Sequence, residues 1–102
     1  MAKLLEIKSS SRKDKKYMAL FQTDEGKQKK VHFGAKGMMD YIHYYAQDPV
    51  HAEERKRLYI IRHGARENHN DPFSPGALSL YILWNRKTLE ASIADYKKKF
   101  HL

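Results

Sequence analysis

The spacing of apolar side chains changes at Gly34, and this change constrains the fold more than any other feature of the sequence. Between residues 17 and 33, aromatic and small apolar side chains occupy alternate positions of two short segments. After residue 74 they recur at three- and four-residue intervals, as in Leu89, Ile93, Tyr96 and Phe100. Alternation is typical of strands, and the wider spacing of helices. The sequence therefore predicts an α+β fold with the sheet first.

Turn and capping residues divide the chain into a three-stranded antiparallel meander followed by three helices. Gly26 supplies the second turn of the meander, and Asp48 and Ser74 each precede a proline that can begin a helix. Strands are expected near 4–7, 17–22 and 29–33, a short helix or turn at 41–45, helices near 49–63, 75–84 and 88–100, and a loop at 66–72. We expect Trp84 to hold the last two helices together. A chain of 102 residues has room for one domain, with a basic hairpin region at 1–37 and a helical region at 38–102.

Positive charge is concentrated in the first third of the chain. The formal net charge is +8; residues 1–37 carry ten basic and four acidic side chains, whereas residues 38–102 carry ten and eight. Such an excess attracts phosphates. On a hairpin the basic residues are expected to lie near one another and contact nucleic-acid backbones without reading bases, although charged loops can also be merely solvated. The predicted phosphate-binding residues are Arg12, Lys13, Lys15, Lys16, Lys27, Lys29, Lys30, Lys36, Arg62 and Arg66.

The chain contains no cysteine, which excludes a disulfide framework and a thiolate zinc site. Its first residues form too short an apolar run for a signal peptide, and no stretch has the length of a membrane span. We therefore expect no membrane partner and no secretion. The expected location is a virion or the interior of a host cell, in the nucleus or the cytoplasm.

One segment resembles an enzyme signature. Residues 58–66 contain the triplet Arg62-His63-Gly64, which looks like the histidine phosphatase pattern. In that pattern a strand runs into an Arg-His-Gly triplet and the histidine accepts a phosphoryl group. Only 36 residues follow Arg66, too few for the remaining catalytic groups of such a domain. We expect no enzymatic activity, and phosphoryl transfer remains a remote alternative.

A second group of polar residues could be drawn as a metal site. His63, Glu67, His69 and Asp71 lie close together in the sequence, in a segment rich in asparagine and aspartate. Such segments are usually turns, and no paired histidines at helical spacing accompany them. We therefore expect no metal and no other cofactor.

Several short motifs resemble an uncharacterised family of small basic proteins found in large nucleocytoplasmic DNA viruses of algae and protists. The matching motifs are Phe33-Gly34-Ala35-Lys36-Gly37, Arg62-His63 followed by Arg66-Glu67, and Leu83-Trp84-Asn85, within residues 33–100. The resemblance implies a viral or protist origin and an assembly context, and it implies no particular activity.

The sequence thus favours a small basic nucleic-acid-binding or virion-associated structural protein. Duplex DNA is the favoured partner, and RNA is a possible one. The alternative is a protein–protein component of a capsid or another large assembly, because a small rigid core with charged extensions suits both roles.

Overall fold

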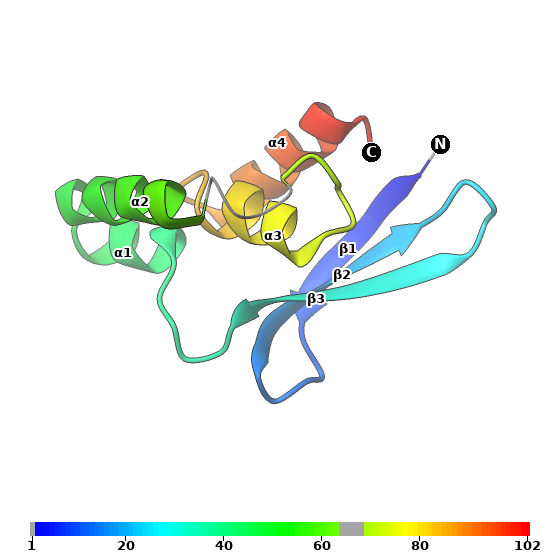
Figure 1. The fold of residues 1–102 in the computed structure, drawn as a ribbon, viewed down its shortest axis with the longest axis horizontal. Helices are drawn as coiled ribbons and strands as arrows, with labels where there is room; N and C mark the ends of the chain where they lie inside the picture. The colour runs from blue at the N-terminus through cyan, green and yellow to red at the C-terminus, as the bar shows by residue number, and fades with distance from the viewer. Residues whose placement is uncertain (1, 64–68) are drawn as a thin grey trace.

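The computed structural model describes residues 2–63 and 69–102, and it has the predicted α+β architecture. Three strands come first, followed by helical segments that gather on one side of the sheet (Figure 1). The elements are β1 (Lys3–Ser9), β2 (Lys15–Gln22), β3 (Gln28–Ala35), α1 (Tyr41–Gln47), α2 (Pro49–His63), α3 (Pro75–Leu78), the π-helical segment η1 (Ser79–Leu83) and α4 (Leu89–Phe100). Every predicted strand and helix therefore has a counterpart.

The sheet is an antiparallel meander in the order β1-β2-β3. Tyr17 pairs with Phe33 and Ala19 with Val31, so alternate residues of β2 and β3 share one face. Gly26, with φ +82°, forms the turn between these strands, as its position in the sequence predicts. The turn between β1 and β2 and the turn between β2 and β3 consequently lie at opposite ends of the sheet (Figure 1).

The hydrophobic core lies between the sheet and the C-terminal helical segments. Phe21 and Phe33 from the sheet are fully buried together with Leu78, Ile82 and Tyr96 from the helices. The hydroxyl of Tyr96 donates to the carbonyl of Pro72. Burial raises the pKa of this phenol because a phenolate would be poorly solvated there. The side chain thus satisfies its polar atom while filling the centre of the core.

The helix expected at 75–84 is divided into α3 and the π-helical segment η1. Ser74 caps α3 by accepting from the backbone N–H of Ala77, with Pro75 in the first turn. A π turn holds one residue more than an α turn. Consecutive side chains, Ile82 and Leu83, are both buried against the core. The sequence spacing predicts helix here but does not reveal the wider turn.

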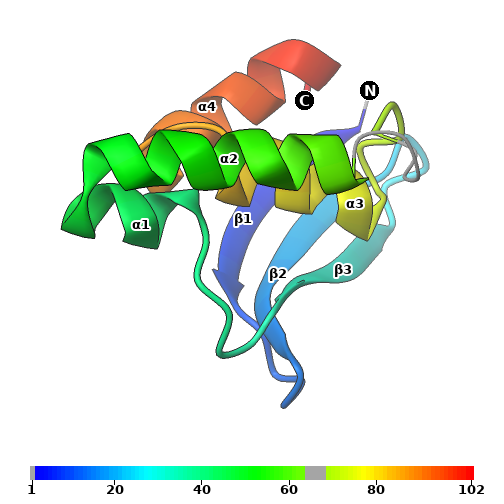
Figure 2. The same cartoon turned by 60° about the vertical axis from the view of Figure 1, so that its left-hand side comes forward.

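Helices α1 and α2 form a hairpin beside the sheet (Figure 2). Asp40 caps α1, and Asp48 accepts from the backbone N–H groups of Val50 and His51 at the start of α2. The segment at 41–45 is thus a full helix, and α2 has the predicted bounds of 49–63. None of the helices described at 2–63 and 69–102 is long and apolar enough to cross a membrane.

Candidate functional site

A groove of about 580 Å³ opens where one end of the sheet meets the helical hairpin. Its walls come from the ends of β2 and β3, the connection to α1, the inner side of α2, and α3 with η1. We call it the basic groove. Its chemistry-bearing lining residues are the basic side chains Lys15, Lys16, Arg55, Arg62 and His63, the aromatic side chains Tyr44, Tyr59 and Trp84, and Asp40.

Helix α2 supplies the two arginines of the basic groove. Arg55 and Arg62 are seven residues apart, which is two helical turns, so both lie on one stripe of the helix. Both are exposed, and the Arg55 guanidinium lies 5.5 Å from the ring centre of Tyr44. A guanidinium presents a planar fork of donors that matches phosphate oxygens. This stripe of α2 is therefore suited to anions.

A column of three rings holds α2 against η1. The ring of Tyr59 stacks on His63 with centroids 4.3 Å apart, and on Trp84 with centroids 4.6 Å apart and planes 9° apart. Two rings at these distances cannot share one face of Tyr59, so they occupy opposite faces. Lys56 adds a hydrogen bond of 2.8 Å from Nζ to the carbonyl of Asn85, just after η1. These contacts fix the orientation in which α2 presents its arginines.

Trp84 contacts more elements than the sequence predicted. It is partly buried against the core, but its ring contacts are with Tyr59 of α2 and Tyr44 of α1, the latter at 6.1 Å. The prediction that it joins the last two helices missed these partners. Buried Tyr96 and Ser92 also join η1 to α4, and the Ser92 hydroxyl accepts from the backbone N–H of Arg86.

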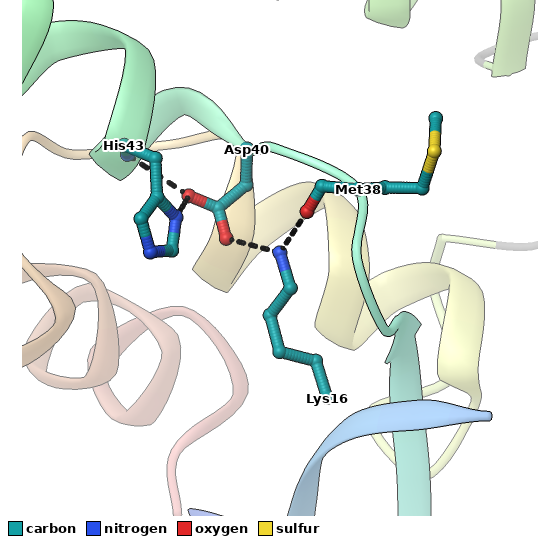
Figure 3. Close-up of polar contacts among 4 residues, drawn as sticks. All are labelled: Lys16, Met38, Asp40 and His43. Atoms are coloured by element: carbon teal, nitrogen blue, oxygen red, sulfur yellow. Dashed lines mark hydrogen bonds and ion pairs between the residues drawn. The ribbon is translucent and has the colours of Figure 1, made fainter. Parts of the chain in front are cut away.

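A buried ion pair forms one wall of the basic groove (Figure 3). The ammonium group of Lys16 lies 2.9 Å from Oδ2 of Asp40 and 2.6 Å from the carbonyl oxygen of Met38. The other carboxylate oxygen, Oδ1, accepts from the backbone N–H of His43 at 3.1 Å and lies 2.7 Å from Nδ1 of its ring. Asp40 is only 1 % exposed. Both carboxylate oxygens of Asp40 thus have partners within the protein.

Lys16 was predicted to contact phosphate, and the structure gives it another role. Its side chain is only 15 % exposed, and its ammonium group is already paired with Asp40. If Lys16 left this pair to bind a phosphate, the buried carboxylate of Asp40 would lose its cation, which costs several kcal/mol. Lys16 therefore connects β2 to the start of α1.

The remaining predicted basic residues of the first 37 positions form two groups rather than one. Backbone pairing brings Lys15 opposite Ala35, and the N–H of Lys36 donates to the carbonyl of Asp14, so the residues of the first connection and Lys36 share one end of the sheet. The second turn lies at the other end because successive turns of a meander alternate. The groups are Arg12, Lys13, Lys15 and Lys36 at the groove end, and Lys27, Lys29 and Lys30, which we call the distal lysine cluster.

Several of these basic side chains lie close to acidic or aromatic side chains. Arg12 lies 3.3 Å from Asp14, and Lys27 lies 3.8 Å from Glu25. The ammonium group of Lys29 lies 5.1 Å from the ring centre of Phe73. Lys27 and Lys29 of the distal lysine cluster border a hollow of about 470 Å³ whose lining also includes two carboxylates, those of Asp24 and Glu25. Two carboxylates therefore offset the positive charge beside the distal lysine cluster, whereas the one described carboxylate that lines the basic groove is paired with Lys16.

Arg62 lies in the basic groove, whereas Arg66 falls outside the described residues. Sequence reasoning missed Arg55 and Tyr59; Arg55 directly follows two glutamates, Glu53 and Glu54, in the sequence. In the structure Glu53 accepts from the hydroxyl of Tyr41, and Glu54 lies 3.9 Å from Arg57. The signal present in the sequence was the spacing of Arg55, Tyr59, Arg62 and His63, which places all four on one side of a helix.

The described residues form a site for neither alternative chemistry. The part of residues 58–66 that the structure describes is helical up to His63, whereas the phosphatase pattern needs a strand before its Arg-His-Gly triplet. Glu67, one of the four residues considered for a metal site, lies outside the described residues. Within 2–63 and 69–102, no group of three or more histidine, aspartate or glutamate side chains could hold a metal ion.

Comparison with known proteins identifies a family. Residues 5–63 match the model of a family of unknown function, DUF5754, which covers more than half of the chain, and the protein belongs to this family. No curated protein and no solved structure matches. The matched region runs from β1 to the end of α2 and includes both arginines of the basic groove.

Proposed function

We propose that this member of the family binds nucleic acid through the phosphate backbone, with the basic groove as the contact surface and without reading the base sequence. One observation carries the proposal. Basic side chains from β2 and from α2 converge on a groove whose one described acidic lining residue, Asp40, is buried and already paired with Lys16.

The geometry supports a positive potential focused inside the groove. Lys15 contributes from the sheet, and Arg55 and Arg62 contribute from two successive positions on α2. Charges that line a concave surface reinforce one another, and each phosphate they neutralise releases condensed counterions. Arginine also binds phosphate through paired hydrogen bonds. These features suit the groove to phosphate groups of a nucleic-acid backbone.

The aromatic rings favour backbone contact over base recognition. Both faces of Tyr59 are covered, one by His63 and the other by Trp84. A nucleobase needs an open ring face on which to stack. The column therefore acts as a support for the arginine stripe, which agrees with binding that is independent of base sequence.

We extend the proposal to a virion-associated role on the strength of the sequence resemblance described above. A component of a larger protein assembly is the second candidate. It is supported by the outer side of α2, where the apolar side chains of Val50 and Ile61 are 82 % and 64 % exposed. Unlike the groove, this surface suits a protein partner.

A binding titration at several salt concentrations tests the proposal. Fluorescence anisotropy of labelled duplex DNA, single-stranded DNA and RNA of equal length should show binding to each at low salt. The logarithm of the affinity should fall with the logarithm of salt concentration by about 0.9 per duplex phosphate contact. Three groove cations predict a slope of about −3 for duplex DNA, and shuffled base sequences should bind equally. Absence of binding at low salt, or affinity independent of salt, would contradict the proposal.

A further inference from the structure

We propose that a second copy of this chain docks on the outer side of α2, so that two α2 helices pair antiparallel about a twofold axis. This surface lies away from the sheet, and Figure 2 shows α2 at the front of the molecule with no other element in front of it. The proposal concerns a different side of α2 from the basic groove.

Four exposed residues of α2 form a seam along its outer side. Val50, Glu54, Arg57 and Ile61 follow one another at intervals of four, three and four residues. This is the spacing at which positions of a heptad face a partner helix. All four are exposed: Val50 and Ile61 at 82 % and 64 %, and the side chains of Glu54 and Arg57 at 63 % and 62 %.

The seam is self-complementary when it is reversed. In an antiparallel pair centred between Glu54 and Arg57, Val50 meets Ile61 of the second copy, and Glu54 meets Arg57 of the second copy. Twofold symmetry repeats both contacts, giving two apolar outer layers and two ion pairs between them. A parallel pairing would place Glu54 against Glu54 and Arg57 against Arg57. Charge complementarity therefore selects both the partner and the orientation.

The ion pair that the isolated chain makes is weak enough to be exchanged. Arg57 Nη2 lies 3.9 Å from Oε1 of Glu54, and both side chains are more than 60 % exposed. An exposed pair at this separation contributes little to stability. In the dimer the same two side chains can bond across the axis while the apolar layers at either end exclude water. Leu58, 39 % exposed, flanks the seam and extends its apolar part.

The predicted dimer is weak and leaves the basic groove open. Two 15-residue helices that meet through four layers of side chains bury less surface area than the roughly 1,200 Å² expected of a stable interface. Arg55 and Arg62 lie on the neighbouring stripe of α2, toward the groove. Pairing therefore places two grooves in one particle without covering either.

Sedimentation equilibrium from low micromolar to near-millimolar concentration tests the proposal in the absence of nucleic acid. The wild-type mass should rise from 12.0 kDa toward twice that value as concentration increases. The Glu54→Arg variant carries arginine at both central positions of the seam, and the Arg57→Glu variant carries glutamate at both. Each alone should remain monomeric, because like charges then face each other across the axis.

An equimolar mixture of these two variants should recover association, since every central contact then joins an arginine to a glutamate. Ile60→Ser, which changes an exposed side chain off the seam, is the matched control and should associate as the wild type does. Circular dichroism establishes that all variants keep their helices. A wild-type mass that stays at 12.0 kDa throughout would overturn the proposal. So would association that the single charge reversals do not weaken, or a mixture that remains monomeric.

Discussion

The ammonium group of Lys16 lies 2.9 Å from Oδ2 of Asp40, and this ion pair connects strand β2 to the residue that caps helix α1. Asp40 is fully enclosed, so its charge depends on Lys16 and on the hydrogen bonds at the helix start. The basic groove opens beside this pair. The contact that positions the helical hairpin thus also neutralises the groove's one described acidic lining residue.

Removing either partner should destabilise the fold, and removing both should cost less than the sum. Asp40→Asn leaves the Lys16 ammonium without its carboxylate, and Lys16→Met leaves a buried carboxylate without its cation. Each single change should lower the free energy of unfolding by about 3 kcal/mol. The double variant should recover at least 1 kcal/mol of that sum, as contacting residues do. Urea unfolding of the four proteins measures this coupling, and strictly additive losses would show that the two groups act independently.

Gly34→Ala should destabilise the chain more than Gly37→Ala. Both glycines have positive φ, +79° and +88°, which costs an L-residue about 1–2 kcal/mol. A Cβ at Gly34 would also lie 2.9 Å from Cδ1 of Leu83 and 3.2 Å from Cβ of Lys16, whereas a Cβ at Gly37 meets nothing within 4 Å. Thermal unfolding of both variants isolates the steric part. Equal losses would show that Leu83 and the Lys16 stem move aside freely.

Tyr41 should make stability fall at high pH. Burial, together with the hydrogen bond to Glu53, raises the pKa of its hydroxyl from 10.0 to about 12 in the folded chain. The folded state therefore favours the protonated phenol, and this contribution is complete below pH 10 and lost as pH rises toward 12. The difference in unfolding free energy between wild type and Tyr41→Phe should be constant below pH 10 and shrink above it. A difference that does not change across this interval would contradict the assignment.

Tyr59→Ala should weaken nucleic-acid binding without changing the net charge. The ring of Tyr59 holds α2 against Trp84, so its loss should leave Arg55 and Arg62 less well oriented. The chain has one tryptophan, whose fluorescence reports directly on this stack and should shift to the red. Tyr45→Ala is the control, because Tyr45 contacts Tyr41 on the same hairpin but does not line the groove. Equal affinities for the two variants would show that the stack of Tyr59 on Trp84 does not contribute to nucleic-acid binding.

The order and bounds of the elements could be predicted from the sequence because they depend on local signals. The alternation of apolar side chains predicted β2 and β3, and the Asp48-Pro49 and Ser74-Pro75 pairs predicted the starts of two helices. The π turn at Ser79–Leu83 could not be predicted, because its wider turn depends on which side chains the core accepts. Local spacing carries no record of that packing.

The site was only partly predictable, because it is assembled from distant segments. Charge counting found Lys15 and Arg62 separately, but only the folded chain brings them to one groove. The same counting included Lys16, whose partner Asp40 is 24 residues away, and it grouped the distal lysine cluster with residues at the opposite end of the sheet. A count of charges does not show which of them already have partners.

The most direct measurement compares two triple variants that remove equal charge from the two ends of the sheet. One replaces Lys15, Arg55 and Arg62 of the basic groove with glutamine, and the other replaces Lys27, Lys29 and Lys30 of the distal lysine cluster. Both lose three positive charges from a net +8, and all six side chains except the half-buried Lys15 are exposed, where charged groups contribute little to stability. Affinity for duplex DNA is then measured for each across a series of salt concentrations. The account predicts that the slope of log affinity against log salt falls in magnitude by about 3 for the groove variant and changes by less than about 1 for the distal variant. Equal slopes for the two variants, or a larger loss in the distal one, would contradict the assignment of the basic groove as the nucleic-acid contact surface.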